Sequence, residues 1–220
     1  MKQTELALRR EVIETCRKMT AIGINQGTSG NVSVRFGDGL LITPSGMDYD
    51  ALKPEDIVLV RADGSHAGRH KPSSEWRFHR DILVRRGEVG AVVHAHSLYA
   101  TALAILGMEI PAVHYMIAAA GGNTIRCAPY ATYGSQELSD HALAALEGRK
   151  ACLLANHGVI ATAPSLAKAL WLAKEVEVLA QQYLLSLQIG RPTILPDDEV
   201  DRIMEKFQSY GPQSQAKDEG

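Results

Sequence analysis

The stretch AVVHAH at residues 91–96 decides the fold, because three small or β-branched residues lead directly into a pair of histidines. A compact apolar run of this kind predicts a strand, Ala91–His96. Successive side chains of a strand point to opposite faces, so His94 and His96, two residues apart, project to the same side. The stretch therefore predicts a buried strand that presents two imidazoles together.

Helical and strand patterns interleave on both sides of this stretch. Polar-apolar periodicity or apolar runs predict helices at residues 4–22, 73–86, 98–106, 165–187 and 197–210. Short β-branched or apolar runs predict strands at residues 31–35, 40–43, 57–60 and 151–156, the first two forming a hairpin around Gly37-Asp38-Gly39. The order of elements predicts an α/β chain without repeats.

Composition limits the classes of partner. The chain has 220 residues with 45% hydrophobic content, enough for one well-buried core, and we expect one domain. Lys and Arg number 23 against 25 Asp and Glu, a net charge of −2, so no basic field attracts nucleic acid or an anionic membrane. Residues 212–220 are polar, and we expect a flexible tail.

Cysteine usage and the first residues bear on the compartment. The three cysteines, Cys16, Cys127 and Cys152, are far apart and have apolar neighbours, which is not the spacing of a disulfide framework. The opening MKQTELALRREVIETCRK is charged throughout and lacks the apolar stretch of a signal peptide. We expect reduced cysteines and a cytoplasmic protein.

A third histidine completes a candidate metal site. His157 follows the apolar 151–156 strand in the sequence ANHG, where the next glycine lets the backbone turn sharply. Three imidazoles on neighbouring strand ends suit a catalytic zinc, which takes three protein ligands and keeps one position open. The alternative is that His157 merely caps a strand.

Glu75 and three clusters of small residues are the remaining candidate functional residues. Glu75, at the start of the expected 73–86 helix, is either a helix-start carboxylate or, facing a metal, a general base. The clusters NQGTSGN (25–31), TPSG (43–46) and Ser73-Ser74 supply backbone amides and hydroxyls suited to an anion such as phosphate. A plain turn uses the same residues. His79, inside the expected helix, is assigned no role.

Taken together, the motifs resemble the class II aldolase/adducin family, in its fuculose-phosphate aldolase branch. The resemblance covers about residues 5 to 211, which it implies are one class II aldolase domain. The segments that carry it are GINQGTSGNVSVR, LLITPSGMDY, KPSSEWRFH, AVVHAHS, PAVHYMIAAAGGN, APYATYG, NHGVIA and KALWLAKEVEVLAQ.

The resemblance implies a fold, an assembly and site residues. The expected fold is a single domain with a central, mainly antiparallel sheet flanked by helices, assembled as a homotetramer with active sites between subunits. It implies one Zn²⁺ per subunit on His94, His96 and His157, with Glu75 as fourth ligand and catalytic base. The positions implied for phosphate or other substrate contacts are Thr28, Asn31, Ser45, Gly46, Ser73, Ser74, Tyr133 and Tyr210.

The activity implied is reversible cleavage of L-fuculose 1-phosphate, or a related ketose 1-phosphate, to dihydroxyacetone phosphate and L-lactaldehyde or a related aldehyde, through a zinc-stabilised enediolate. Tyr115 matches a catalytic tyrosine that reaches in from a neighbouring subunit. Ser45 and Tyr133 stand where close relatives have threonine and phenylalanine. Ser45 keeps the hydroxyl, whereas Tyr133 adds a polar group near the aldehyde pocket.

Other members of the family supply the competing interpretations. A ribulose-phosphate 4-epimerase has a similar site but has Asp where this chain has Glu75, and a 5-deoxyribulose 1-phosphate aldolase differs only in the aldehyde. A methylthioribulose-phosphate dehydratase matches the surrounding motifs less well. A non-catalytic adducin-like interaction module lacks the full set of metal ligands that this chain contains.

Overall fold

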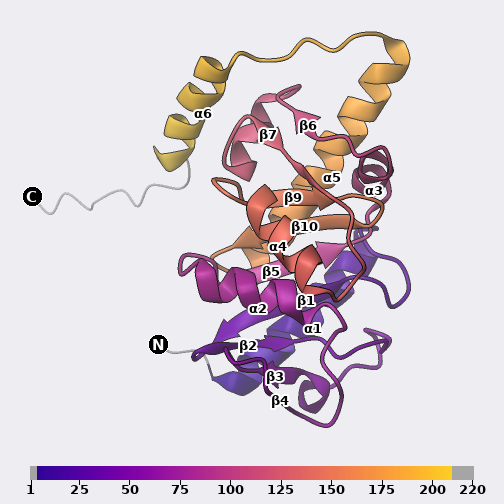
Figure 1. Cartoon of the computed structure of the whole chain (residues 1–220), viewed down its shortest axis with the longest axis vertical. Helices are drawn as coiled ribbons and strands as arrows, with labels where there is room; N and C mark the ends of the chain where they lie inside the picture. Colours follow the sequence, from indigo (N-terminus) through magenta and orange to yellow (C-terminus); the bar gives the residue numbers. More distant parts are fainter. Residues whose placement is uncertain (1–3, 210–220) are drawn as a thin grey trace, which may run out of the picture.

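The computed structural model describes residues 4–209, and its centre is one eight-stranded sheet. The strands are β1 (Asn31–Phe36), β2 (Gly39–Ile42), β3 (Val58–Val60), β4 (His66–Ala67), β5 (Ala91–Ala95), β8 (Cys127–Ala128), β9 (Ala151–Leu154) and β10 (Gly158–Ala163). They lie in the order β4-β3-β2-β1-β5-β10-β9-β8, and every neighbouring pair is antiparallel except β8 and β9. β6 (Ile110–Pro111) and β7 (Thr124–Ile125) form a separate small ladder (Figure 1).

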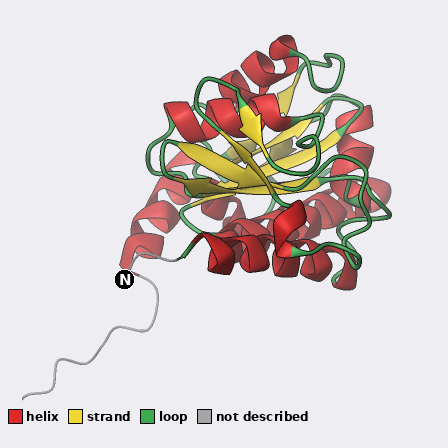
Figure 2. Cartoon of the chain, turned by 90° about the horizontal axis from the view of Figure 1, so that it is seen from below, coloured by secondary structure: helices red, strands yellow, loops and turns green. Residues whose placement is uncertain are grey.

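Helices cover both faces of the sheet, as Figure 2 shows. One face packs against α1 (Glu5–Ala21), α3 (Leu98–Ile105) and α5 (Leu166–Ile189). The other packs against α2 (Trp76–Arg85) and α4 (Gln136–Ala145). A single-turn 3-10 helix, η1 (Pro54–Asp56), precedes β3, and α6 (Asp197–Ser209) packs on the longer 3-10 segment η2 (Tyr115–Ala120). The expected single α/β domain with a mainly antiparallel, helix-flanked sheet is confirmed.

Two apolar cores, one on each face, follow from the alternation of side chains along the strands. In β5, Val93 packs into the core beneath α5, whereas Val92 packs into the core beneath α2. His94 has the same parity as Val92, and its ring meets the buried Phe78 of α2 edge-on at 5.4 Å between centroids. The sheet therefore directs His94 toward the α2 face.

Several strand and helix boundaries differ from the sequence-based expectations by one to three residues. The helix expected from Ser73 begins at Trp76, because the Ser73 N–H donates to the Thr43 carbonyl and Pro44 bridges to Pro72, which holds this backbone extended. The strand expected to reach Asn156 ends at Leu154.

β10 was not expected at all. Its sequence GVIATA includes three residues that favour strands, Val159, Ile160 and Thr162, and it pairs with β5 on one side and β9 on the other. The turn before it also differs from expectation, because the positive φ of 54° belongs to Asn156. Gly158 instead allows β10 to approach β5: a Cβ there would lie 2.4 Å from the Ala95 carbonyl oxygen.

We predict that Gly158→Ala destabilises the protein by about 1–3 kcal/mol, because the added methyl forces the β5 and β10 backbones apart. The matched control is Gly87→Ala, where an added Cβ meets no atom within 4 Å. Denaturant unfolding of both variants provides the measurement. Equal stability of the two variants would contradict the close packing of β10 on β5.

Candidate metal centre

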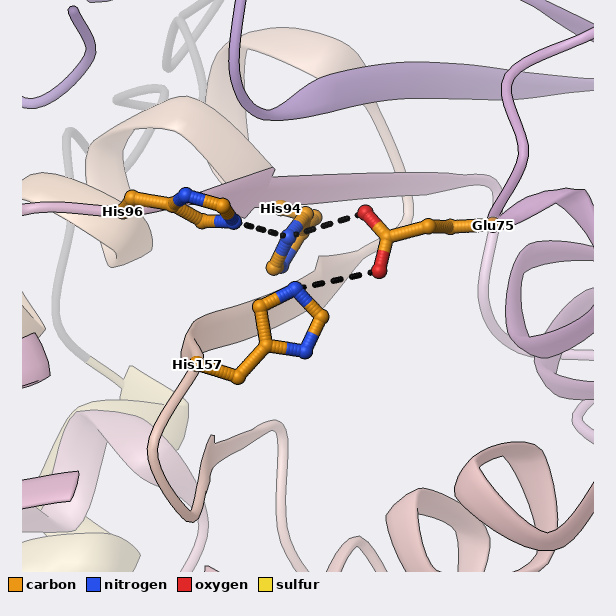
Figure 3. Close-up of side chains that lie close together, drawn as sticks. All are labelled: Glu75, His94, His96 and His157. Atoms are coloured by element: carbon orange, nitrogen blue, oxygen red, sulfur yellow. Dashed lines mark hydrogen bonds and ion pairs between the residues drawn. The ribbon is translucent and has the colours of Figure 1, made fainter. Parts of the chain in front are cut away.

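Strand pairing brings His157 to the two histidines at the end of β5, from a distant part of the chain (Figure 3). His94 lies in β5, paired with Asn31 of β1 on one side and Ile160 of β10 on the other. His96 follows the end of β5, and His157 lies in the tight turn between β9 and β10. The structure thus brings together the three imidazoles that the sequence singled out.

The three rings form a nearly symmetric propeller. Their centroids lie 4.9 Å apart for His94 and His96, 4.8 Å for His94 and His157, and 5.0 Å for His96 and His157. The ring planes of each pair are inclined by 74° or 75°. Equivalent orientations of this kind let each ring direct one nitrogen toward a common point.

Glu75 closes the cluster from the opposite side. Its Oε2 atom lies 3.1 Å from His94 Nε2, and its Oε1 atom lies 3.1 Å from His157 Nε2. Glu75 occupies the N-cap position of α2, yet its side chain accepts no hydrogen bond from the helix. The carboxylate is therefore directed at the histidines. Glu75 is buried there, with only 6% of the residue exposed.

The donor set and its spacing fit a divalent cation. His94 Nε2 and His96 Nε2 are 3.0 Å apart, and one atom from each of the four side chains lies within 4.8 Å of all the others. Neighbouring ligand atoms in a tetrahedral zinc site lie roughly 3.3 Å apart, given Zn–N bonds of about 2.05 Å. Two ring nitrogens that face each other need a proton or a cation between them, and a cation satisfies all four groups at once.

Hydrogen bonding and burial prepare the cluster for a metal. The Nδ1 atom of His94 lies 2.9 Å from the Val159 carbonyl oxygen, which can only accept, so Nδ1 is a donor and Nε2 is the nitrogen that faces the cluster. Burial, together with the neighbouring His94 and His157, lowers the pKa of His96 to about 4, so the ring is neutral. Burial alone raises the pKa of Glu75, but His94 and His157 outweigh it and hold the pKa well below its usual range.

A buried polar row supports Glu75 from behind. The Asn31 side chain donates from Nδ2 to Glu75 Oε2 at 2.9 Å, and its Oδ1 meets Nε2 of His79. The other ring nitrogen of His79 lies 2.7 Å from Ser33 Oγ. Asn31, expected at the phosphate, thus contacts the carboxylate and lines the pocket, while His79 had been assigned no role.

A pocket of about 320 Å³ opens over the cluster and gathers most of the other expected residues. One part of its wall consists of small hydroxyl and glycine residues, and another consists of aromatic and amide side chains. Among the sequence-predicted residues, it is lined by Thr28, Asn31, Ser45, Gly46, Ser73, Ser74, Glu75, His96, Tyr133 and His157.

Tertiary contacts fix the glycine-rich wall of this pocket. The buried Tyr49 hydroxyl donates to the Gly30 carbonyl at 2.7 Å and lies 3.3 Å from that of Ser29. At Gly30, φ is +76° and a Cβ would lie 2.8 Å from the His94 carbonyl oxygen, so only glycine fits. The loop is thereby held directly beside the strand that carries the candidate metal ligands.

Two expected site residues are not among those that line the pocket in the described part of the chain. Tyr115 is 50% exposed at the start of η2 and is not among the described residues that line the pocket. Tyr210 lies outside the described residues 4–209, as does the expected tail at 212–220.

The pocket also contains residues that the sequence did not single out. Tyr130 and Asn156 line it beside Tyr133 and His157.

The contact of His79 with the site was detectable in principle from the sequence. His79 follows Glu75 by four residues, a spacing that places two side chains on the same side of a helix. Asn156 gave no such signal, since its positive φ depends on the turn and on its N–H bond to the Ala104 carbonyl.

The fold and the cluster define an α/β protein with a candidate divalent-metal site, and comparison with known proteins identifies its family. Residues 10–184 match the family model described as "Class II Aldolase and Adducin N-terminal domain". The chain is 58% identical over 215 residues to a 5-methylthioribulose-1-phosphate/5-deoxyribulose-1-phosphate aldolase of Rhodospirillum rubrum, covering 98% of this chain and 97% of the relative.

Two further comparisons point the same way. The chain is 54% identical over 212 residues to an L-fuculose phosphate aldolase of Escherichia coli, covering 96% of this chain and 98% of the relative. A solved structure of L-fuculose 1-phosphate aldolase superposes with a TM-score of 0.90 at 42% identity, covering 94% of this chain and 98% of the other. The chain belongs to the class II aldolase and adducin family and is an aldolase of that class.

Helices that are both long and apolar enough to cross a lipid bilayer are absent from residues 4–209.

We predict that the purified protein retains about one zinc ion per chain after dialysis, as expected for a closed set of histidine ligands. The double variant His94→Ala, His96→Ala loses it, because two of the four ligand atoms are gone. His141→Ala, which removes a histidine outside the cluster, serves as the control. Elemental analysis gives the readout, and full zinc occupancy in the double variant would refute the site.

Proposed function

We propose that this protein is a zinc-dependent aldolase that reversibly cleaves a ketose 1-phosphate to dihydroxyacetone phosphate and a short aldehyde. The observation that carries the proposal is the buried Glu75 carboxylate, 3.1 Å from both His94 and His157, in the pocket that contains the hydroxyl cluster. A carboxylate, three imidazoles and an anion-binding wall are the groups needed to polarise a ketone, move a proton and hold a phosphate.

Phosphate binding is assigned to the small-residue wall. Thr28, Ser45, Ser73 and Ser74 bring hydroxyls to one pocket, and Gly46 leaves room for close approach of an anion. The 43–46 loop lies beside the 71–73 segment because Ser45 N–H donates to the Lys71 carbonyl. These hydroxyls and nearby backbone amides would fix the register of the substrate relative to Glu75.

Proton movement is assigned to Glu75. A zinc ion held by His94, His96 and His157 would polarise the carbonyl and neighbouring hydroxyl of the substrate and stabilise the negative charge that develops as the C3–C4 bond breaks. Glu75, held by Asn31 on one oxygen, then delivers a proton to the carbon that becomes C3 of dihydroxyacetone phosphate. In the reverse direction the same carboxylate removes that proton.

The aldehyde end is assigned to tyrosines. Tyr133 and Tyr130 form the wall beside the metal ligands, and the Tyr133 hydroxyl adds a polar group there. Tyr115 handles the proton of the C4 hydroxyl and is contributed by a second copy of the chain, in a homotetramer with active sites between subunits. Its position outside the pocket of its own chain supports that assignment. We also assign Tyr210 to the aldehyde end.

The candidate substrates share a terminal carbon without a hydroxyl group. L-Fuculose 1-phosphate, the substrate in the name of the 54% identical relative, yields lactaldehyde on cleavage between C3 and C4. The 58% identical relative favours a second candidate pair, 5-deoxyribulose and 5-methylthioribulose 1-phosphates, which yield acetaldehyde and its methylthio derivative. We therefore propose a deoxy or methylthio ketose 1-phosphate as substrate.

A coupled assay for dihydroxyacetone phosphate tests the substrate class. We expect cleavage of L-fuculose, 5-deoxyribulose and 5-methylthioribulose 1-phosphates with kcat/KM above that for D-ribulose 1-phosphate, whose terminal carbon bears a hydroxyl. EDTA abolishes cleavage and zinc restores it. Preference for D-ribulose 1-phosphate, or epimerisation of a phosphoketose without triose release, would overturn the proposal.

Glu75→Gln tests the proton carrier. We expect zinc to remain bound by the three histidines while kcat falls by about 10²–10⁴-fold, because the amide cannot act as a base. The control is Glu88→Gln, which alters a carboxylate that pairs with Arg86 and is not among the residues that line the pocket. Unchanged turnover in Glu75→Gln would remove Glu75 from the mechanism.

A further inference from the structure

A continuous row of buried polar groups links β1 and α2 behind the carboxylate of Glu75. Ser33 and His79 are fully buried, and Asn31 is 4% exposed. The row runs from Ser33 Oγ to His79 Nδ1 at 2.7 Å, from His79 Nε2 to Asn31 Oδ1 at 2.5 Å, and from Asn31 Nδ2 to Glu75 Oε2 at 2.9 Å. Each residue of the row comes from an element that packs rigidly in the core.

The direction of every hydrogen bond in this row follows from its last member. An ionised carboxylate only accepts, so Asn31 must turn its NH₂ group toward Glu75 and its Oδ1 toward His79. The Oδ1 atom also only accepts, so His79 must carry its proton on Nε2. Burial, with His94 nearby, lowers the pKa of His79 to about 3, so the ring is neutral and Nδ1 accepts the Ser33 hydroxyl proton.

We propose that His79 is a positioning residue, which, with Nε2 protonated and Nδ1 bonded to the Ser33 hydroxyl, locks the Asn31 amide with its NH₂ group toward Glu75. The opposite tautomer would turn His79 Nε2 into an acceptor and require the Asn31 amide to flip. The flipped amide would place Oδ1 against the carboxylate oxygen, so two acceptors would face each other in a buried site, an arrangement that is strongly unfavourable.

The locked Asn31 amide fixes the orientation of the Glu75 carboxylate. The effect on catalysis rests on the proposed function, in which Glu75 moves a proton. Asn31 holds Oε2, which leaves Oε1 on the side of His157. A carboxylate held at one oxygen keeps a defined direction when its other oxygen gains or loses a proton. Loss of the lock therefore lowers turnover more than it weakens substrate binding, since the hydroxyl residues of the pocket, Thr28, Ser45, Ser73 and Ser74, do not belong to the row.

The tautomer itself is directly measurable, without substrate. In ¹⁵N-histidine-labelled, zinc-loaded protein, we expect His79 to show a protonated Nε2 and an unprotonated Nδ1 in a long-range ¹H–¹⁵N NMR spectrum. A protonated Nδ1 on His79 would overturn the proposal at this first step.

Ser33→Ala removes only the hydroxyl that satisfies Nδ1 of His79. We expect the His79 ring to lose its fixed orientation and kcat to fall about 10-fold, the scale typical of lost outer-shell support, with KM little changed. Ser139→Ala is the matched control, because Ser139 is equally buried and donates to Asp81 away from the site. Equal kcat in wild type and Ser33→Ala would overturn the proposal.

Two substitutions of His79 separate positioning from packing. His79→Gln keeps an N–H donor for Asn31, whereas His79→Leu has similar volume and no donor. We expect the Gln variant to retain several times the kcat of the Leu variant at comparable melting temperature, and equal losses would overturn the proposal. If both fail to fold, the wild-type NMR spectrum and Ser33→Ala decide. If the protein cleaves none of the phosphoketoses, the proposed function fails, while the NMR spectra still test the row.

Discussion

The register of β5 between β1 and β10 is the constraint on which the site depends. His94 is opposite Asn31 on one side and Ile160 on the other, and its Nδ1 reaches the Val159 carbonyl. Because side chains alternate along a strand, a slip of one residue would turn His94 into the opposite core and Val93 toward α2. The two apolar cores, each specific for its face, prevent that slip and so fix the imidazole.

Around His94, buried polar groups are held in place by hydrogen bonds. Glu75 and His94 are buried polar groups whose burial is costly unless they are paired. The Asn31 amide and the Val159 carbonyl each orient one of them, and a divalent cation would compensate both. The same backbone segments carry the pocket wall, since Gly30 packs against the His94 carbonyl. Stability of the sheet and geometry of the site are therefore coupled.

Much of this arrangement could be predicted from the sequence, where local rules apply. Strand alternation predicted that His94 and His96 share a face, and an apolar strand followed by a turn pointed to His157. β10 was missed although Val159, Ile160 and Thr162 favour a strand, and its place between β5 and β9 became visible only in the fold. The role of His79 escaped because it depends on a partner 48 residues away in sequence.

Contacts between chains cannot be predicted from local sequence patterns or from the fold of a single chain. Tyr115 is exposed at the start of η2, and its proposed role requires a second copy. The resemblance supplied that expectation, since periodicity and spacing contain no information about which exposed tyrosine faces a neighbour's pocket. The same holds for Tyr133, whose place on the pocket wall is visible in the fold but whose effect depends on the aldehyde.

The central claim is that Glu75, beside the metal centre, moves a proton on the carbon next to a ketone. Incubating the zinc-loaded protein with dihydroxyacetone phosphate in D₂O, without any aldehyde, tests it most directly by proton NMR. The account predicts loss of one hydrogen from the hydroxymethyl carbon and none from the phosphate-bearing carbon. Retention of both hydroxymethyl hydrogens, in a preparation that cleaves a ketose 1-phosphate, would contradict it.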